Sequence, residues 1–268
     1  MEYVVIILFI LVGMALFYNS FRTLRQFRLI KDTPRSKIRS MAIGIVEIHG
    51  HVEADEFIKS PFSKTDCVYY KYEIKEYRKH TERDSNGRTK TKYQWDTVSF
   101  GDQRINFTAV DETGKVPVNP DGAEITVNYK KSFYQHTGTS GGFSSILDSL
   151  KNWGKGDQFD IDFSKMELIP MASGVKVGKA RVGDRKYLEY YIEPNDSLFM
   201  LGTAANDRSV QDNVIIKQGE NEKTFIIADR SEKETLKNLK KTMLAGFIIG
   251  PILIIGGILA LLHIDKFQ

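Results

Sequence analysis

Two uncharged apolar segments lie near the ends of the chain. The first runs from Tyr3 to Tyr18 and the second from Met243 to His263. At about 1.5 Å per residue, a helix of the second length spans the ~30 Å hydrocarbon layer of a bilayer, and the first reaches that length with the three residues that follow it. Core helices of soluble domains seldom carry such runs. We therefore predict transmembrane helices at residues 1–21 and 243–263, and an integral membrane protein with two spans.

Basic residues lie on the inner side of each apolar segment. Glu2 precedes the first segment, whereas a cleavable signal peptide has positive charge there, so we expect this segment to stay as an anchor. Because Lys and Arg favour the cytoplasmic side, the central region is predicted to face the cytoplasm. The residues expected at the membrane surface, where they would attract anionic lipid headgroups, are Arg22, Arg25, Arg28, Lys31, Lys237, Lys240 and Lys241.

Between the two spans, apolar and polar positions alternate with the period of two that is typical of β-strands. Strands at 67–78 and 91–100 flank Asn86-Gly87, a pair that favours a hairpin turn. The predicted fold class is mainly β, with a small β-barrel or sandwich, OB-like as one option, between the flanking helices. Further strands are predicted at 41–53, 104–111, 115–118, 124–129, 159–163, 175–181, 187–192, 197–204, 214–218 and 223–227.

The predicted organisation places a β-rich domain, residues 41–229, between two connecting segments, and its two halves form either one domain or two. A basic juxtamembrane segment covers 22–40, and a juxtamembrane helix covers 230–242, with Ser231 as N-cap and Glu234 completing a capping box. Residues 264–268 form a tail. Within the domain, residues 136–156 carry a short amphipathic pattern, which is interpreted either as a helix that covers an open barrel end or as a helix that lies on the bilayer or on a partner.

Composition limits the kinds of ligand and metal site that the chain can form. Net charge is only +4, so it gives no general polyanion-binding signal, and a single Cys with five His excludes both a disulfide framework and the two four-ligand zinc sites of a RING. Cys67 has no evident His or Asp partner, so no catalytic residue is assigned and enzymatic activity stays uncertain. His49 and His51 are spaced to share a strand face, but the sequence assigns no third ligand. No metal or cofactor is therefore expected.

The turn region of the predicted hairpin is rich in basic residues. It is interpreted either as a solvated loop or as a surface that contacts a protein partner, with the tyrosines Tyr69, Tyr70, Tyr72 and Tyr77 as a contact face below it. Nucleic acid is not expected, because aromatic residues are not interleaved with the basic ones along a single strand. The predicted partner-binding residues are Arg78, Lys79, Arg83, Arg88, Lys90 and Lys92.

The second span contains a G-x-x-x-G pair, Gly246 and Gly250. Because glycine has no side chain, such a pair lets another helix approach closely. The partner is either the first span or a second copy of the chain, which would make a homo-oligomer. Glycine is also common in membrane helices without this role.

Several segments of the chain together form a family pattern: Asp32–Ser40, Gly44–Gly50, Pro61, Cys67–Tyr72, Trp95, Asp111–Gly114 with Val116 and Val118, Leu198–Gly202 and Phe225–Asp229. Over roughly residues 30–235, these segments resemble the GIDE family. That resemblance implies a domain held between two transmembrane helices, as in RING-type E3 ubiquitin ligases of mitochondria, where a RING follows the second helix. No RING is expected here, because five residues follow His263.

The sequence therefore predicts a membrane-anchored module of the GIDE family that binds a partner or substrate and lacks the RING needed for ubiquitin transfer. Two alternatives remain at this stage. One is a ligase-like subunit that acts with a separate RING or conjugating factor. The other is a structural membrane protein that oligomerises through its glycine-bearing span.

Overall fold

The computed structural model describes residues 2–83, 87–135, 169–171, 180–208, 210, 213–229 and 232–264. The predicted helix at 136–156, the strand at 159–163, most of the strand at 175–181 and the Ser231 cap lie outside these residues. The chain divides into two compact units whose segments alternate along the sequence. Unit 1 comprises Met1–Gly50, Ala109–Thr126 and Ser197–Gln268, and unit 2 comprises His51–Thr108 and Val127–Asp196.

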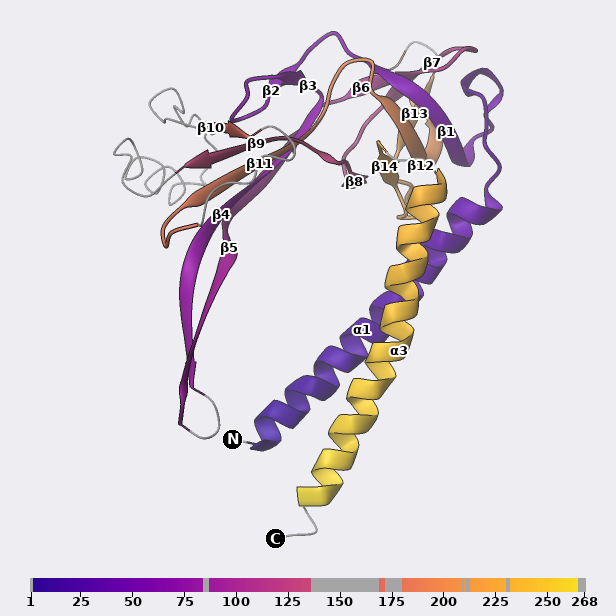
Figure 1. The fold of residues 1–268 in the computed structure, drawn as a ribbon. Coiled ribbons are helices and arrows are strands. Elements are labelled where there is room, and N and C mark those ends of the chain that lie inside the picture. Colours follow the sequence, from indigo (N-terminus) through magenta and orange to yellow (C-terminus); the bar gives the residue numbers. More distant parts are fainter. Residues whose placement is uncertain are drawn as a thin grey trace. The chain divides into compact units, whose positions relative to one another are not determined.

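Two long helices of unit 1, α1 (Glu2–Asp32) and α3 (Glu232–Ile264), lie side by side with both chain ends at the same end of the pair (Figure 1). Each continues well beyond the predicted span, through basic residues toward the strands. α1 ends shortly before Pro34, because proline disfavours helical backbone in the residue that precedes it. Both helices are long and apolar enough to cross a membrane, and only 11% and 17% of their apolar windows are buried inside the protein.

The strands of unit 1 form one sheet whose order is β1-β6-β7-β13-β12-β14-β8, and a further pairing of β1 with β12 closes five of them into a ring. β12 is antiparallel to β13 and β14, whereas β13–β7 and β14–β8 are parallel pairs. The strands are β1 (Gly44–Glu53), β6 (Phe107–Val110), β7 (Lys115–Val118), β8 (Glu124–Thr126), β12 (Ser197–Asn206), β13 (Val214–Lys217) and β14 (Ile226–Ala228); a short 3-10 turn, Ile38–Ser40, lies between α1 and β1.

One hydrophobic cluster joins the helices of unit 1 to its sheet. Ile30 of α1 is 1% exposed and packs with Phe199 and Leu201 of β12 and with Ile226 of β14. Leu29, Leu236 and Leu239 complete the contact from both helices. Burial of four large apolar side chains stabilises such a contact by several kcal/mol, at about 1.5–3 kcal/mol each. The strand-side ends of α1 and α3 are therefore packed onto the sheet.

Unit 2 holds a second sheet, with the order β10-β9-β11-β4-β5. β4 and β5 form the predicted hairpin, in one-to-one register from Lys75↔Thr97 to Arg83↔Thr89, with a bulge next to Ile74. Both strands are longer than the sequence pattern predicts. The elements are β4 (Tyr69–Arg83), β5 (Thr89–Arg104), β9 (Tyr129–Gln135), β10 (Ile169–Met171) and β11 (Arg185–Ile192), beside a small ribbon of β2 (Ile58–Lys59) and β3 (Asp66–Cys67).

The core of unit 2 is aromatic. Tyr72 and Ile74 of β4 pack with Phe62 and with Tyr187 of β11. Below them, the side chain of Glu189 is fully buried and accepts hydrogen bonds from the backbone N–H groups of Phe62 and Ser63. The predicted fold class, mainly β with a small closed barrel and two flanking apolar helices, is confirmed.

Candidate functional site

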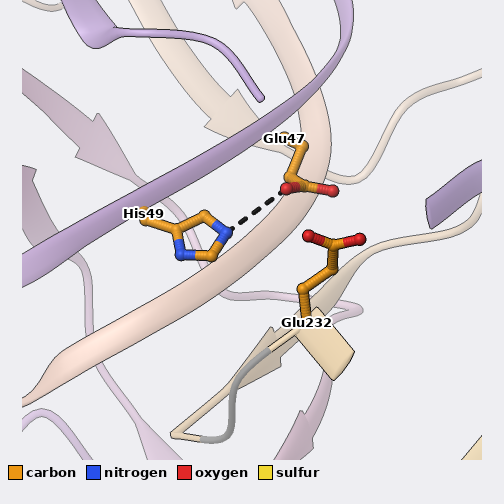
Figure 2. Close-up of side chains that lie close together, drawn as sticks. All are labelled: Glu47, His49 and Glu232. Carbon is orange, nitrogen blue, oxygen red and sulfur yellow. Dashed lines mark hydrogen bonds and ion pairs between the residues drawn. The ribbon is translucent and has the colours of Figure 1, made fainter. Parts of the chain in front are cut away.

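A cluster of possible metal-ligating side chains lies where β1 meets the start of α3, within unit 1. Glu47 and His49 are two residues apart on β1 and therefore share a face of the strand. Glu232 is the first residue of α3. Figure 2 shows the three side chains converging. One ligand atom from each lies within 4.8 Å of the others, and His49 Nε2 is 3.2 Å from Glu47 Oε1.

The carboxylate of Glu47 is the most buried member of the cluster. The residue is 2% exposed, and its Oε2 atom has no hydrogen-bond partner among the described residues. Burial, together with the negative charge of Glu232, raises the pKa of Glu47 to about 7, against the opposing charge of Arg35. Burial also lowers the pKa of His49, as does Arg35. The neutral imidazole that results keeps a nitrogen lone pair available as a ligand.

The sequence pattern found only part of this cluster. It paired His49 with His51, but in the structure His51 Nε2 lies 3.8 Å from Glu53 Oε1 and is not in the cluster. Glu47 could have been found, because it lies two residues before His49 on the same strand. Glu232 could not, because it comes from the far end of the chain and only the tertiary fold brings it to β1.

The hairpin of unit 2 has two different faces. Strand alternation and the register place one set of charged residues together, and we call this set the charged face. There Arg78 Nε lies 2.9 Å from Glu76 Oε1, and His80 Nε2 lies 2.6 Å from Asp96 Oδ2. Hydrogen bonds from Gln94 and His80 lower the pKa of Asp96. The charged face consists of Glu76, Arg78, His80, Glu82, Lys90, Lys92, Gln94 and Asp96.

The opposite face of the hairpin combines aromatic and basic residues and contains no acidic residue between positions 75 and 83 or between 89 and 97. Tyr77 stacks on Tyr93 with ring centroids 6.1 Å apart and lies 5.2 Å from Trp95. Lys186 of β11 places its Nζ 4.3 Å from the centre of the Trp95 ring, a favourable cation–π contact. We call Lys75, Tyr77, Lys79, Thr81, Arg83, Thr89, Thr91, Tyr93, Trp95 and Thr97 the aromatic face.

Glycines hold α1 and α3 close together. A Cβ atom on Gly250 would lie 3.0 Å from the backbone oxygen of Gly13, and one on Gly246 would lie 3.0 Å from that of Leu16. Further along, a Cβ atom on Gly257 would lie 2.5 Å from the side-chain Cγ1 of Ile10. Contacts that run in opposite directions along the two helices define an antiparallel pair. The face of α3 that carries Gly246 and Gly250 therefore contacts the first helix of the same chain.

A polar cavity of about 370 Å³ lies where the two helices reach the sheet. Asn19 lines it from α1 and Thr242 from α3, so the apolar segment of each helix ends at the same level. Gln26 crosses this region and donates to Glu124 Oε2 at 2.9 Å. Its other lining residues are Arg22, Thr23, Thr126, Ile226, Thr235, Asn238 and Leu239.

Comparison with protein families gave a match to the model described as GIDE, E3 ubiquitin ligase, over residues 76–262. The chain belongs to the GIDE family. Comparison with curated proteins and with solved structures gave no significant match. The GIDE match begins later than the resemblance noted in the sequence and continues through most of α3. It includes the hairpin from Glu76 onward and Glu232, while Glu47 and His49 lie before it.

Within the GIDE domain, the six basic residues predicted to bind a partner do not form one surface. Arg78, Lys90 and Lys92 belong to the charged face, whereas Lys79 and Arg83 belong to the aromatic face, and Arg88 follows the turn. All six are exposed.

Two of the tyrosines predicted as a contact face are not available. Tyr69 is 4% exposed and Tyr72 is 3% exposed, because both sides of β4 are covered at that end of the hairpin. Tyr72 belongs to the core cluster, and Arg104 lies over the ring of Tyr69. Tyr70 and Tyr77 are half-buried.

The seven basic residues predicted at the membrane surface are all exposed on α1 and α3. Arg25 also has a protein partner, because its Nη2 lies 2.6 Å from Glu222 Oε2. This ion pair links α1 to the loop before β14 within unit 1. Arg25 therefore orients the helix on the sheet as well as adding positive charge beside the apolar segment.

Proposed function

We propose that this GIDE-family chain is a membrane-anchored module that binds a partner protein. Membrane anchoring is supported by the place at which the two helices change from apolar to polar residues. Asn19 of α1 and Thr242 of α3 line the same cavity, so both helices change at the same height along the pair. Beyond that level, large apolar side chains point outward from the pair; Leu8 and Leu259 are each 60% exposed. A bilayer would bury this apolar surface, whereas its exposure to water over this length would be unfavourable.

The basic flanks of the two helices support the same anchor. Lys237, Lys240 and Lys241 are exposed on α3 just before its apolar segment, and Arg22 and Arg28 are exposed on α1 just after its own. Positive charge at this level attracts anionic headgroups by roughly 1 kcal/mol per residue. Under the positive-inside rule, the same charges favour a cytoplasmic location for the sheet-bearing side.

The aromatic face of the hairpin supports partner binding. Its exposed Tyr93 and half-buried Trp95 and Tyr77 are residue types enriched at protein interfaces. Lys79 and Arg83 add positive charge without an acidic residue on their face, whereas on the charged face Arg78 lies beside Glu76 and His80 beside Asp96. The partner segment that suits the aromatic face is therefore acidic, with apolar or aromatic anchors.

The family match favours a role beside ubiquitin transfer rather than transfer by this chain through a RING of its own. These 268 residues contain one Cys and five His, too few for two four-ligand zinc sites. We propose that the partner is a substrate of a ligase or a separate RING or conjugating factor. Co-purification of a small RING or ubiquitin-like protein with the full chain would select the second kind of partner.

Photo-crosslinking in native membranes tests the partner face. A photoreactive residue at position 93 is expected to attach one defined partner, and the double substitution K79E and R83E is expected to reduce this product about tenfold, which corresponds to about 1.4 kcal/mol. Like charge would then face the acidic segment.

The matched control reverses two charges on the other side of the same hairpin. The double substitution K90E and K92E changes net charge equally but lies on the charged face, so the crosslinked product should persist. Equal loss in both double variants, or no product at position 93, would remove the aromatic face from the proposal.

A further inference from the structure

We propose that Glu47, His49 and Glu232 form a binding site for a divalent transition-metal ion of the zinc type. The site goes beyond the proposed function, since neither membrane anchoring nor partner binding requires it. Its ligands come from β1 and from the first residue of α3. The metal would therefore bond the barrel directly to the helix that carries the second apolar segment.

The donor geometry is close to that of a metal site. Ligand atoms around a tetrahedral zinc ion lie about 2.1 Å from the metal and so about 3.4 Å from one another. The pair His49 Nε2 and Glu47 Oε1 is already 3.2 Å apart, and the whole set of three fits within 4.8 Å. Glu232 is half-buried, so a rotamer change of its side chain can close the remaining gap.

The orphaned oxygen of Glu47 is the independent observation that points to a ligand. Buried carboxylate oxygens almost always have a hydrogen-bond donor or a cation, because an unpaired one is costly. Glu47 is 2% exposed, its Oε2 has no donor among the described residues, and the carboxylate points toward Glu232 (Figure 2). Arg35 contributes positive charge nearby, but no ion pair joins it to either carboxylate in the described part of the chain.

The donor set selects the class of metal. One imidazole with two carboxylates suits zinc and its neighbours, whereas calcium and magnesium prefer oxygen ligands alone. The ring of His49 is held edge-on by Phe199, with centroids 5.4 Å apart, which restricts the orientation of its nitrogens. Three protein ligands leave at least one coordination position for water.

Zinc binding to the tag-free full chain in detergent micelles tests the site. Competition with a chromogenic chelator is expected to show one zinc ion per chain, and zinc is expected to raise the thermal unfolding temperature. Each of the substitutions E47Q, H49A and E232Q should weaken zinc binding at least tenfold. Magnesium at the same concentration should leave the unfolding temperature unchanged.

His51→Ala is the matched control, because His51 lies two residues from His49 on the same strand but outside the cluster. Its zinc affinity should equal that of the parent chain. The inference is overturned if the parent binds zinc no better than E232Q, or if His51→Ala loses as much affinity as His49→Ala. Glu232 is half-buried and is the first residue of α3, so the E232Q variant should fold. It therefore keeps the test decisive even if E47Q or H49A fails to fold.

Discussion

Replacement of Gly250 by leucine is expected to destabilise the α1–α3 pair by about 1–3 kcal/mol or more, the cost of overpacking a close contact. Even a Cβ atom at this position would lie 3.0 Å from the backbone oxygen of Gly13 and 3.0 Å from Cβ of Phe17. Backbone cannot move aside as a flexible side chain does. The larger leucine side chain must therefore push the two helices apart.

Gly256→Leu provides the control within the same helix. A Cβ atom at Gly256 would meet nothing within 4 Å, so this substitution adds the same side chain where there is space. Thermal unfolding of the full chain in detergent should show a lower midpoint for Gly250→Leu and nearly the parent value for Gly256→Leu.

The same variants separate packing within one chain from pairing between copies. If Gly250→Leu abolished a crosslinked dimer and left the unfolding midpoint unchanged, the glycine face would pair copies instead of α1 with α3. Equal effects of the two substitutions would also contradict the packing described here.

Cys67 is expected to react with thiol reagents about a thousandfold more slowly in the folded chain than in the unfolded chain at pH 8. The reacting species is the thiolate, and burial, followed by the charges of Glu189 and Asp66, raises the pKa of Cys67 from 9.0 to about 12. The thiol is fully buried and lies 3.4 Å from the backbone oxygen of Ile58. These properties describe a small core residue rather than a nucleophile.

Labelling with a chromogenic disulfide reagent, with and without denaturant, measures this ratio. A Thr97→Cys chain in which Cys67 is serine supplies an exposed thiol within the same unit, and this thiol should react rapidly when folded. Rapid labelling of Cys67 in the folded chain, at the rate of position 97, would contradict its assignment as an inert core residue and reopen thiol chemistry as a function.

Local sequence patterns correctly predicted those helices and strands whose formation depends mainly on residues close together in the chain. The apolar runs predicted both helices, and the alternation around Tyr72 with the Asn86-Gly87 turn predicted the hairpin. The C-terminal end of α1 was underestimated, because the basic residues after its apolar run favour helix as well as the membrane surface. Pro34, two residues after α1 ends, was the better indicator of that boundary.

Features that join distant segments could not be predicted in this way. Closure of the barrel depends on β1 pairing with β12, and the segments that make up the two units alternate along the chain. The division of the basic residues between two hairpin faces required the register, since a shift of one residue would move Lys79 to the opposite face. Glu232 likewise reaches His49 only through the packing of α3.

The level at which α1 and α3 leave the bilayer is the most direct test of the membrane anchor. Single cysteines placed along both helices, in the Cys67→Ser chain reconstituted in lipid vesicles, can be labelled with a membrane-impermeant maleimide. We expect slow labelling at Leu8 and Ile252 and a rise in rate at Asn19 on one helix and Thr242 on the other. Labelling at Leu8 and Ile252 as fast as at the exposed Lys92 position would contradict it.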